Sequence, residues 1–171
     1  SLEIVAYQIK KTIIHSKRRF TYEEAQDVLD GKLADSLSQK LLDMNALAKK
    51  IRAKRFDAGS IDFRTSEIRF QLDETGKPTG VVKKTQLDSM RLIEEYMLLA
   101  NRCVAKHIEN IQTASGFESP FIYRVHDRPS ETKIAFLENF LRGLNIDIKF
   151  PKQITPKQFQ TMMHPILNGD Q

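Results

Sequence analysis

The carboxylates and imidazoles of this sequence, the side chains best suited to metal-ion chemistry, are dispersed along the chain. Two-metal hydrolysis needs several carboxylates within a few ångströms of one another, because two cations must contact both the attacking and the leaving oxygen. The eleven aspartates occur singly rather than in a close cluster. The histidines show no zinc-ligand spacing with Cys103; they are His15, His107, His126 and His164. We therefore expect no metal site within this chain.

Two adjacent glutamates, Glu94 and Glu95, stand in the middle of a long helical apolar pattern. Adjacent residues of an α-helix project about 100° apart, so one carboxylate can face inward while the other meets solvent. A carboxylate turned inward needs a partner, and a hydroxyl would suffice. Taken alone, Glu94 is most simply interpreted as a solvated or ion-paired helix residue.

The chain is basic, with a formal net charge of +5 and a pI near 9.3. Such a charge raises the local concentration of a polyanion such as nucleic acid. A basic tract covers residues 49–55. Two interpretations of it remain open, cations at a helix C-terminus or contacts to phosphates. Both glycine-rich patterns, GxxxxGK[ST] and GxGxxG, are missing from the sequence, which disfavours a nucleotide-binding enzyme.

The composition is that of a folded protein, with 40% hydrophobic and 29% charged residues. The length suits one domain or a large part of one, and no apolar run approaches the roughly 20 residues of a membrane span. The single cysteine and the lack of a basic-then-apolar leader favour a reducing compartment, so we expect a cytoplasmic location. The sequence begins at Ser1 in a strand-like run, which suggests a piece of a longer chain.

Hydrophobic periodicity predicts an α+β fold of antiparallel strands, a long central helix and several shorter helices. Alternating or β-branched apolar residues predict strands near 2–15, 59–63, 67–72, 80–82 and 121–126. Helical spacing predicts helices near 22–30, 33–55 and 85–112, one that opens at 129–131 and one short helix after 151. The first of these helices begins with a capping box, Thr21 to Glu24, and Gly31 can close it in the left-handed conformation.

Four segments carry a resemblance to a known family. The run Leu92-Ile93-Glu94-Glu95-Tyr96-Met97-Leu98-Leu99-Ala100-Asn101 resembles the LIEE-x-M-x-LAN helix of the ribonuclease II/ribonuclease R catalytic (RNB) domain. The other three agree in order and spacing: Phe20-Thr21-Tyr22, Ile61-Asp62-Phe63 followed by Glu67-Ile68-Arg69-Phe70, and Tyr123-Arg124-Val125-His126-Asp127-Arg128-Pro129-Ser130. The resemblance covers roughly residues 5–150 and is strongest to bacterial ribonuclease R. Residues 1–171 are thus interpreted as the central segment of an RNB catalytic domain.

The resemblance implies a parent enzyme that degrades single-stranded RNA processively from the 3′ end. Members of the family hydrolyse RNA to nucleoside 5′-monophosphates with Mg²⁺ as cofactor, inside a channel that admits single strands. The aspartate motif of the family would lie upstream of Ser1, and its arginine-bearing SPIRR segment would lie beyond Gln171. We therefore expect this chain to contribute no catalytic residue, to hold no metal and to be inactive when isolated.

Three residues acquire roles from the resemblance. Tyr22 corresponds to a tyrosine that packs at the 3′-terminal nucleotide, and Glu94 to the glutamate paired with it, which together favour ribose over deoxyribose. A site that hydrogen-bonds the 2′-hydroxyl rejects an analogue without it, because the polar groups of the site are then left unpaired. Phe63 resembles a phenylalanine that clamps the stacked bases, although ordinary core packing is an equal alternative.

Two other functions remain open at this stage. A non-catalytic RNA-binding or regulatory protein could keep the RNB scaffold without its metal site, and the basic charge permits this. A helical interaction module unrelated to RNA would require the LIEE-x-M-x-LAN match to be accidental. The exoribonuclease hypothesis predicts that Tyr22 and Glu94 approach each other on a concave surface. The oligomeric state is left undetermined by the sequence.

Overall fold

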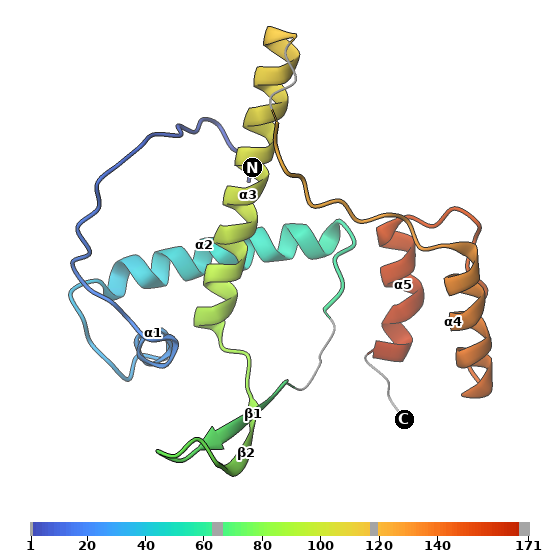
Figure 1. The fold of residues 1–171 in the computed structure, drawn as a ribbon, viewed down its shortest axis with the longest axis horizontal. Helices are drawn as coiled ribbons and strands as arrows, with labels where there is room; N and C mark the ends of the chain where they lie inside the picture. The colour runs from blue at the N-terminus through green and yellow to red at the C-terminus, as the bar shows by residue number, and fades with distance from the viewer. Residues whose placement is uncertain (1, 63–66, 117–119, 168–171) are drawn as a thin grey trace. The chain divides into compact units, whose positions relative to one another are not determined.

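The structure is a computed structural model that describes residues 2–62, 67–116 and 120–167. Its described residues form five α-helices and one antiparallel hairpin (Figure 1). In chain order these elements are α1 (Tyr22–Leu29), α2 (Ser38–Asp57), β1 (Glu67–Leu72), β2 (Pro78–Lys84), α3 (Asp88–Ser115), α4 (Glu131–Gly143) and α5 (Pro156–Leu167). The predicted α+β class is therefore confirmed, and within these ranges no helix is both long and apolar enough to cross a bilayer.

The chain divides into two compact units. The first comprises residues 1–52 and 64–116, and the second comprises residues 53–63 and 117–171. In the first unit, α1 and α2 pack against the N-terminal half of α3, where Ser89, Leu92 and Glu95 are all buried. Their three-residue spacing places them along one side of the helix. Val28 of α1 and Ala48 of α2 are buried in the same unit.

Strands β1 and β2 form a hairpin whose register runs from Glu67 opposite Lys84 to Gln71 opposite Gly80. The register shifts after Gln71, as in a β-bulge. In the turn, one carboxylate oxygen of Asp73 accepts hydrogen bonds from the backbone N–H groups of Thr75 (2.8 Å) and Lys77 (2.9 Å). The strands predicted near 67–72 and 80–82 are confirmed as the two strands of this hairpin.

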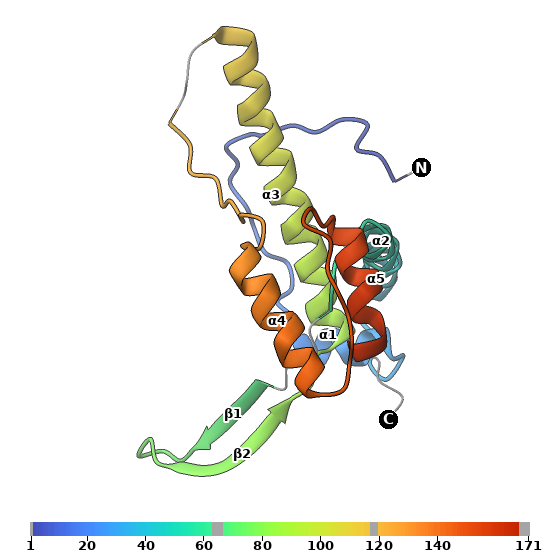
Figure 2. The ribbon, with the colours of Figure 1, turned by 90° about the vertical axis from the view of Figure 1, so that its right-hand side faces the viewer.

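The second unit is organised around α4 and α5, which run beside each other in both ribbon views (Figure 2). Phe150, in the connection between them, stacks on Phe159 of α5 with ring centroids 5.4 Å apart. The backbone N–H of Phe150 also donates to Glu138 of α4 at 2.7 Å. Gln160 of α5 donates from its side-chain amide to the carbonyl of Phe56, in the last turn of α2, and to the carbonyl of Ser60, just after α2, so α5 is held against the end of α2 as well.

Three predicted strands are wrong. Residues 2–15, the described part of 59–63, and 121–126 form no strand in the structure. Alternation reveals which side chains share a face, but a strand also requires a partner for its backbone groups, and no such partner pairs with these segments in the described ranges. Their apolar side chains are accordingly open to solvent, for example Ile13 and Ile122.

The helix boundaries differ from the predicted ones by a few residues at both ends. Helix α2 begins at Ser38 rather than near residue 33, because Asp35 and Ser38 form a local turn: the backbone N–H of Asp35 donates to the Ser38 hydroxyl and its carboxylate accepts from Leu37. Helix α3 spans Asp88–Ser115 instead of about 85–112, and it ends at the left-handed Gly116. The short C-terminal helix is confirmed as α5.

Candidate functional site

Tyr22 is the first residue of α1, and a capping box fixes its backbone. The Thr21 hydroxyl accepts from the N–H of Glu24 at 3.1 Å, and the Glu24 carboxylate accepts from the N–H of Thr21 at 2.9 Å. This confirms the cap predicted from the sequence and satisfies two donors that a helix start would leave unpaired. The side chain of Tyr22 is exposed, with 45% of its surface accessible, so its ring can meet a ligand.

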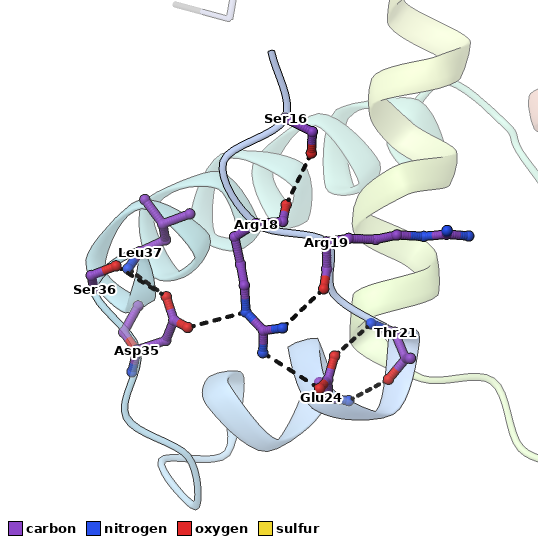
Figure 3. A network of polar contacts seen from close by, with 9 residues as sticks. Ser16, Arg18, Arg19, Thr21, Glu24, Asp35, Ser36 and Leu37 are labelled. Atoms are coloured by element: carbon purple, nitrogen blue, oxygen red, sulfur yellow. Dashed lines mark hydrogen bonds and ion pairs between the residues drawn. The ribbon is translucent and has the colours of Figure 1, made fainter.

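Arg18 ties the segment before α1 to the connection between α1 and α2 (Figure 3). Its guanidinium donates to Asp35 at 3.3 Å, to Glu24 at 3.4 Å and to the carbonyl of Arg19 at 3.1 Å. The same group lies 4.5 Å from the ring centroid of Phe20. Arg18 thereby connects the segment before Tyr22 to Glu24 in the first turn of α1 and to Asp35 in the connection between α1 and α2.

The carboxylates of this network are held in their charged form. The hydrogen bond from the Thr21 backbone lowers the pKa of Glu24 below its ordinary value of 4.5, and Arg18 lowers it further. The backbone N–H of Leu37 lowers the pKa of Asp35, again with help from Arg18. Because the charged form accepts these bonds, the cap is strongest where both groups are ionised.

Helix α1 is joined to the start of α3 through Ser89. The Ser89 hydroxyl donates to the carbonyl of Tyr22 at 2.8 Å, and the Ser89 backbone N–H donates to the side-chain oxygen of Gln26 at 3.1 Å. Ser89 is only 3% exposed. The backbone of Tyr22 is therefore anchored to the helix that carries Glu94.

The two adjacent glutamates of α3 lie in different environments. Glu95 is 1% exposed and forms an ion pair with Arg52 of α2 at 3.5 Å. Glu94 is half-buried, and its carboxylate accepts from the side chain of Gln86, just before α3, at 3.5 Å. One carboxylate does face inward, as the helical geometry predicted, and the guanidinium of Arg52 is one of its partners.

The basic tract at residues 49–55 is partly structural. Lys49 forms an ion pair with Asp88 of α3 at 2.8 Å, and Arg52 pairs with Glu95. These two cations hold α2 against α3 and favour the structural interpretation of the tract at both positions. The phenol of Tyr96 adds a bond from α3 to the carbonyl of Met44 in α2 at 3.4 Å, and burial raises the pKa of this phenol.

The structure thus brings together the elements that carry Tyr22 and Glu94, while Phe63 lies outside the described residues. Sequence reasoning missed Arg18, Gln26 and Ser89, the side chains that make these connections. A serine in the first turn of a helix and a glutamine in the middle of another gave no signal of a tertiary contact. Within the described ranges, no group of three or more His, Cys, Asp or Glu side chains could hold a metal ion.

Comparisons with known proteins agree on one family. Residues 1–169 match the RNB domain family. The chain is 37% identical over 163 residues to ribonuclease R of Aquifex aeolicus, an alignment that covers 92% of this chain and 22% of that protein. It is also 35% identical over 151 residues to DIS3-like exonuclease 2 of Schizosaccharomyces pombe, with coverage of 80% and 16%. The chain therefore spans about a fifth of the length of these relatives.

A solved structure has the same fold over most of the chain. Ribonuclease R of Mycoplasma genitalium, in complex with ribose-methylated single-stranded RNA, superposes with a TM-score of 0.75 and 28% sequence identity. The match covers 91% of this chain and 24% of that one. Together with the family match over residues 1–169, this shows that the chain belongs to the RNB-domain exoribonuclease family, which includes ribonuclease R and the DIS3-like exonucleases.

Proposed function

We propose that this chain is the central part of the catalytic domain of an exoribonuclease that degrades single-stranded RNA from the 3′ end to nucleoside 5′-monophosphates. Membership of the RNB-domain family and the likeness to a ribonuclease R bound to single-stranded RNA support the proposal. Within that reaction, we assign to this segment the positioning of the 3′-terminal nucleotide by Tyr22 and Glu94, and a base-clamping role to Phe63.

The observation that carries the proposal is the junction of α1 and α3. Tyr22 begins α1 with an exposed ring, its carbonyl is bound by Ser89, and Glu94 follows in the same uninterrupted α3. An aromatic ring can stack on a terminal base, and a carboxylate can accept a hydrogen bond from a ribose hydroxyl. The two groups together suit a site that distinguishes ribose from deoxyribose.

The Mg²⁺ ions of the reaction would supply the activated water and the charge neutralisation at the scissile phosphate. We propose that the carboxylates that bind them belong to the rest of the protein. The described side chains of this segment offer no ligand cluster for such ions. What this chain does in the reaction is to bind and orient the RNA end.

The test is degradation of a 3′-tailed, 5′-end-labelled RNA in the presence of Mg²⁺, with the full-length protein and this chain assayed side by side. We expect the full-length protein to release nucleoside 5′-monophosphates and the isolated chain to release none. Activity of the isolated chain would overturn the assignment of the metal site to other segments. If the full-length protein binds RNA but does not degrade it, the proposed nuclease function is wrong and the protein is a non-catalytic RNA-binding protein.

A further inference from the structure

We infer that Ser89 and Gln26 form a positioning pair that sets Tyr22 relative to Glu94 and so determines how strictly the protein requires a ribose at the RNA 3′ end. The inference rests on the proposed function, in which Tyr22 and Glu94 hold the terminal nucleotide. In this inference, Ser89 and Gln26 fix the position of Tyr22 and do not themselves contact the RNA.

Ser89 uses both of its donors on α1. Its hydroxyl binds the carbonyl of Tyr22 at 2.8 Å and its backbone N–H binds the Gln26 side chain at 3.1 Å. Two bonds to residues one helical turn apart restrain the direction of α1 as well as its position. A single bond would leave α1 free to pivot about it.

Gln26 also replaces a missing helix cap. The residue at the N-cap of α3 is Leu87, which makes no side-chain capping bond, and the first N–H groups of a helix have no partner within it. The side-chain oxygen of Gln26, which belongs to α1, accepts a hydrogen bond from one of these N–H groups, that of Ser89. Gln26 is itself oriented by a bond from its amide to Asp30 at 2.8 Å. The start of α3 is therefore completed by α1.

The distance from this junction to Glu94 is set by the helix. Ser89 and Glu94 are five residues apart in α3, which corresponds to about 7.5 Å along the axis of an α-helix. Because Ser89 is 3% exposed, water does not readily replace its bonds when they are broken. Loss of the pair would shift Tyr22 relative to Glu94 without altering either residue.

The experiment uses the full-length protein and two RNAs that differ only in the terminal sugar, one with ribose throughout and one with a single 2′-deoxyribose at the 3′ end. The measured quantity is the ratio of the two kcat/KM values for removal of the terminal nucleotide. A variant that merely misfolds in part loses active protein for both substrates equally, so the ratio does not change. Misplacement of Tyr22 changes the ratio.

The variants are Ser89→Ala and Gln26→Ala, with Ser115→Ala as the matched control. Ser115 lies in the same helix and also donates its hydroxyl to a backbone carbonyl at 2.8 Å, but within α3. We expect the preference for ribose to fall about tenfold in both Ser89→Ala and Gln26→Ala and to stay at the wild-type value in Ser115→Ala.

Glu94→Gln serves as the reference for the site itself. A lowered ratio in Glu94→Gln together with unchanged ratios in Ser89→Ala and Gln26→Ala would overturn the inference and leave the proposed function standing. An unchanged ratio in Glu94→Gln would overturn the role of Glu94 and the inference together. An equal fall of the ratio in Ser115→Ala would also contradict the inference, because it would show that the effect is not specific to the junction of α1 and α3.

Discussion

Glu94 and Glu95 are neighbours in the sequence, yet the fold gives them different tasks. Glu95 is buried against Arg52 and serves the packing of α2 on α3. Glu94 is half-buried, and its carboxylate accepts a hydrogen bond from the Gln86 side chain. The helical pattern showed that one of the pair would turn inward, but it could not identify the buried one. That choice depends on Arg52, which belongs to another helix.

Removal of the Arg52 guanidinium tests whether its ion pair with Glu95 stabilises the packing of α2 on α3. We expect Arg52→Met to lower the free energy of unfolding by about 3 kcal/mol, because it takes an ion-pair partner from a carboxylate that is shielded from water. Urea-induced unfolding followed by circular dichroism measures this change. Lys50→Met is the matched control, since Lys50 is exposed on the same helix, and a similar loss there would contradict the explanation.

At the scale of elements, the sequence predicted well wherever the determining contacts are local. The capping box of α1 needs only Thr21 and Glu24, which are three residues apart. The long apolar stripe likewise lies within one helix, and it predicted α3 correctly. Strands were predicted poorly, because pairing depends on a second segment that alternation does not reveal. The junction at Ser89 was missed for the same reason, since its partners Tyr22 and Gln26 lie far away in sequence.

The cap of α1 should depend on pH. The pKa of Glu24 is lowered in the folded chain, so its contribution to stability is complete above its ordinary value of 4.5 and is lost as the pH falls through the folded pKa. We expect Glu24→Gln to be less stable than the wild type at pH 7 and equally stable at low pH, where Glu24 is protonated. Urea titrations at both pH values measure the difference. A difference that persists at low pH would refute the cap as its cause.

The packing of α5 in the second unit depends on Gly59. Its φ is +110°, and an added Cβ would lie 2.5 Å from the backbone nitrogen of Lys157. We expect Gly59→Ala to lower the free energy of unfolding by about 3 kcal/mol, the sum of a clash and of strain in the left-handed region. Urea-induced unfolding measures the loss.

Two other glycines separate these causes. Gly31 has a φ of +75° but nothing within 4 Å of an added Cβ, so Gly31→Ala should cost about 1 kcal/mol from backbone strain alone. Gly143 has open space and no left-handed backbone, so Gly143→Ala should cost nothing. Equal losses at Gly31 and Gly59 would show that the approach of α5 to Gly59 contributes no energy.

At the scale of the whole molecule, family and fold were accessible from sequence because the LIEE-x-M-x-LAN run fixes both at once. The match over residues 1–169 and the superposition on a ribonuclease R confirm that resemblance. The roles of single residues are less accessible, since the chain spans about a fifth of the length of its relatives. Tyr22, Glu94 and Phe63 accordingly remain predictions.

We propose that this segment holds the 3′-terminal nucleotide of RNA at the start of α1 and the middle of α3. The most direct test of this proposal is photo-crosslinking of an RNA with 4-thiouridine at the 3′ terminus to the full-length protein in EDTA, which prevents degradation, followed by trypsin digestion and mass spectrometry. The tryptic peptides 20–32 and 92–102 contain Tyr22 and Glu94 respectively. We predict crosslinks in one or both of these peptides, which weaken when the 4-thiouridine is moved ten nucleotides upstream. Crosslinks confined to peptides elsewhere in the protein would contradict the proposal.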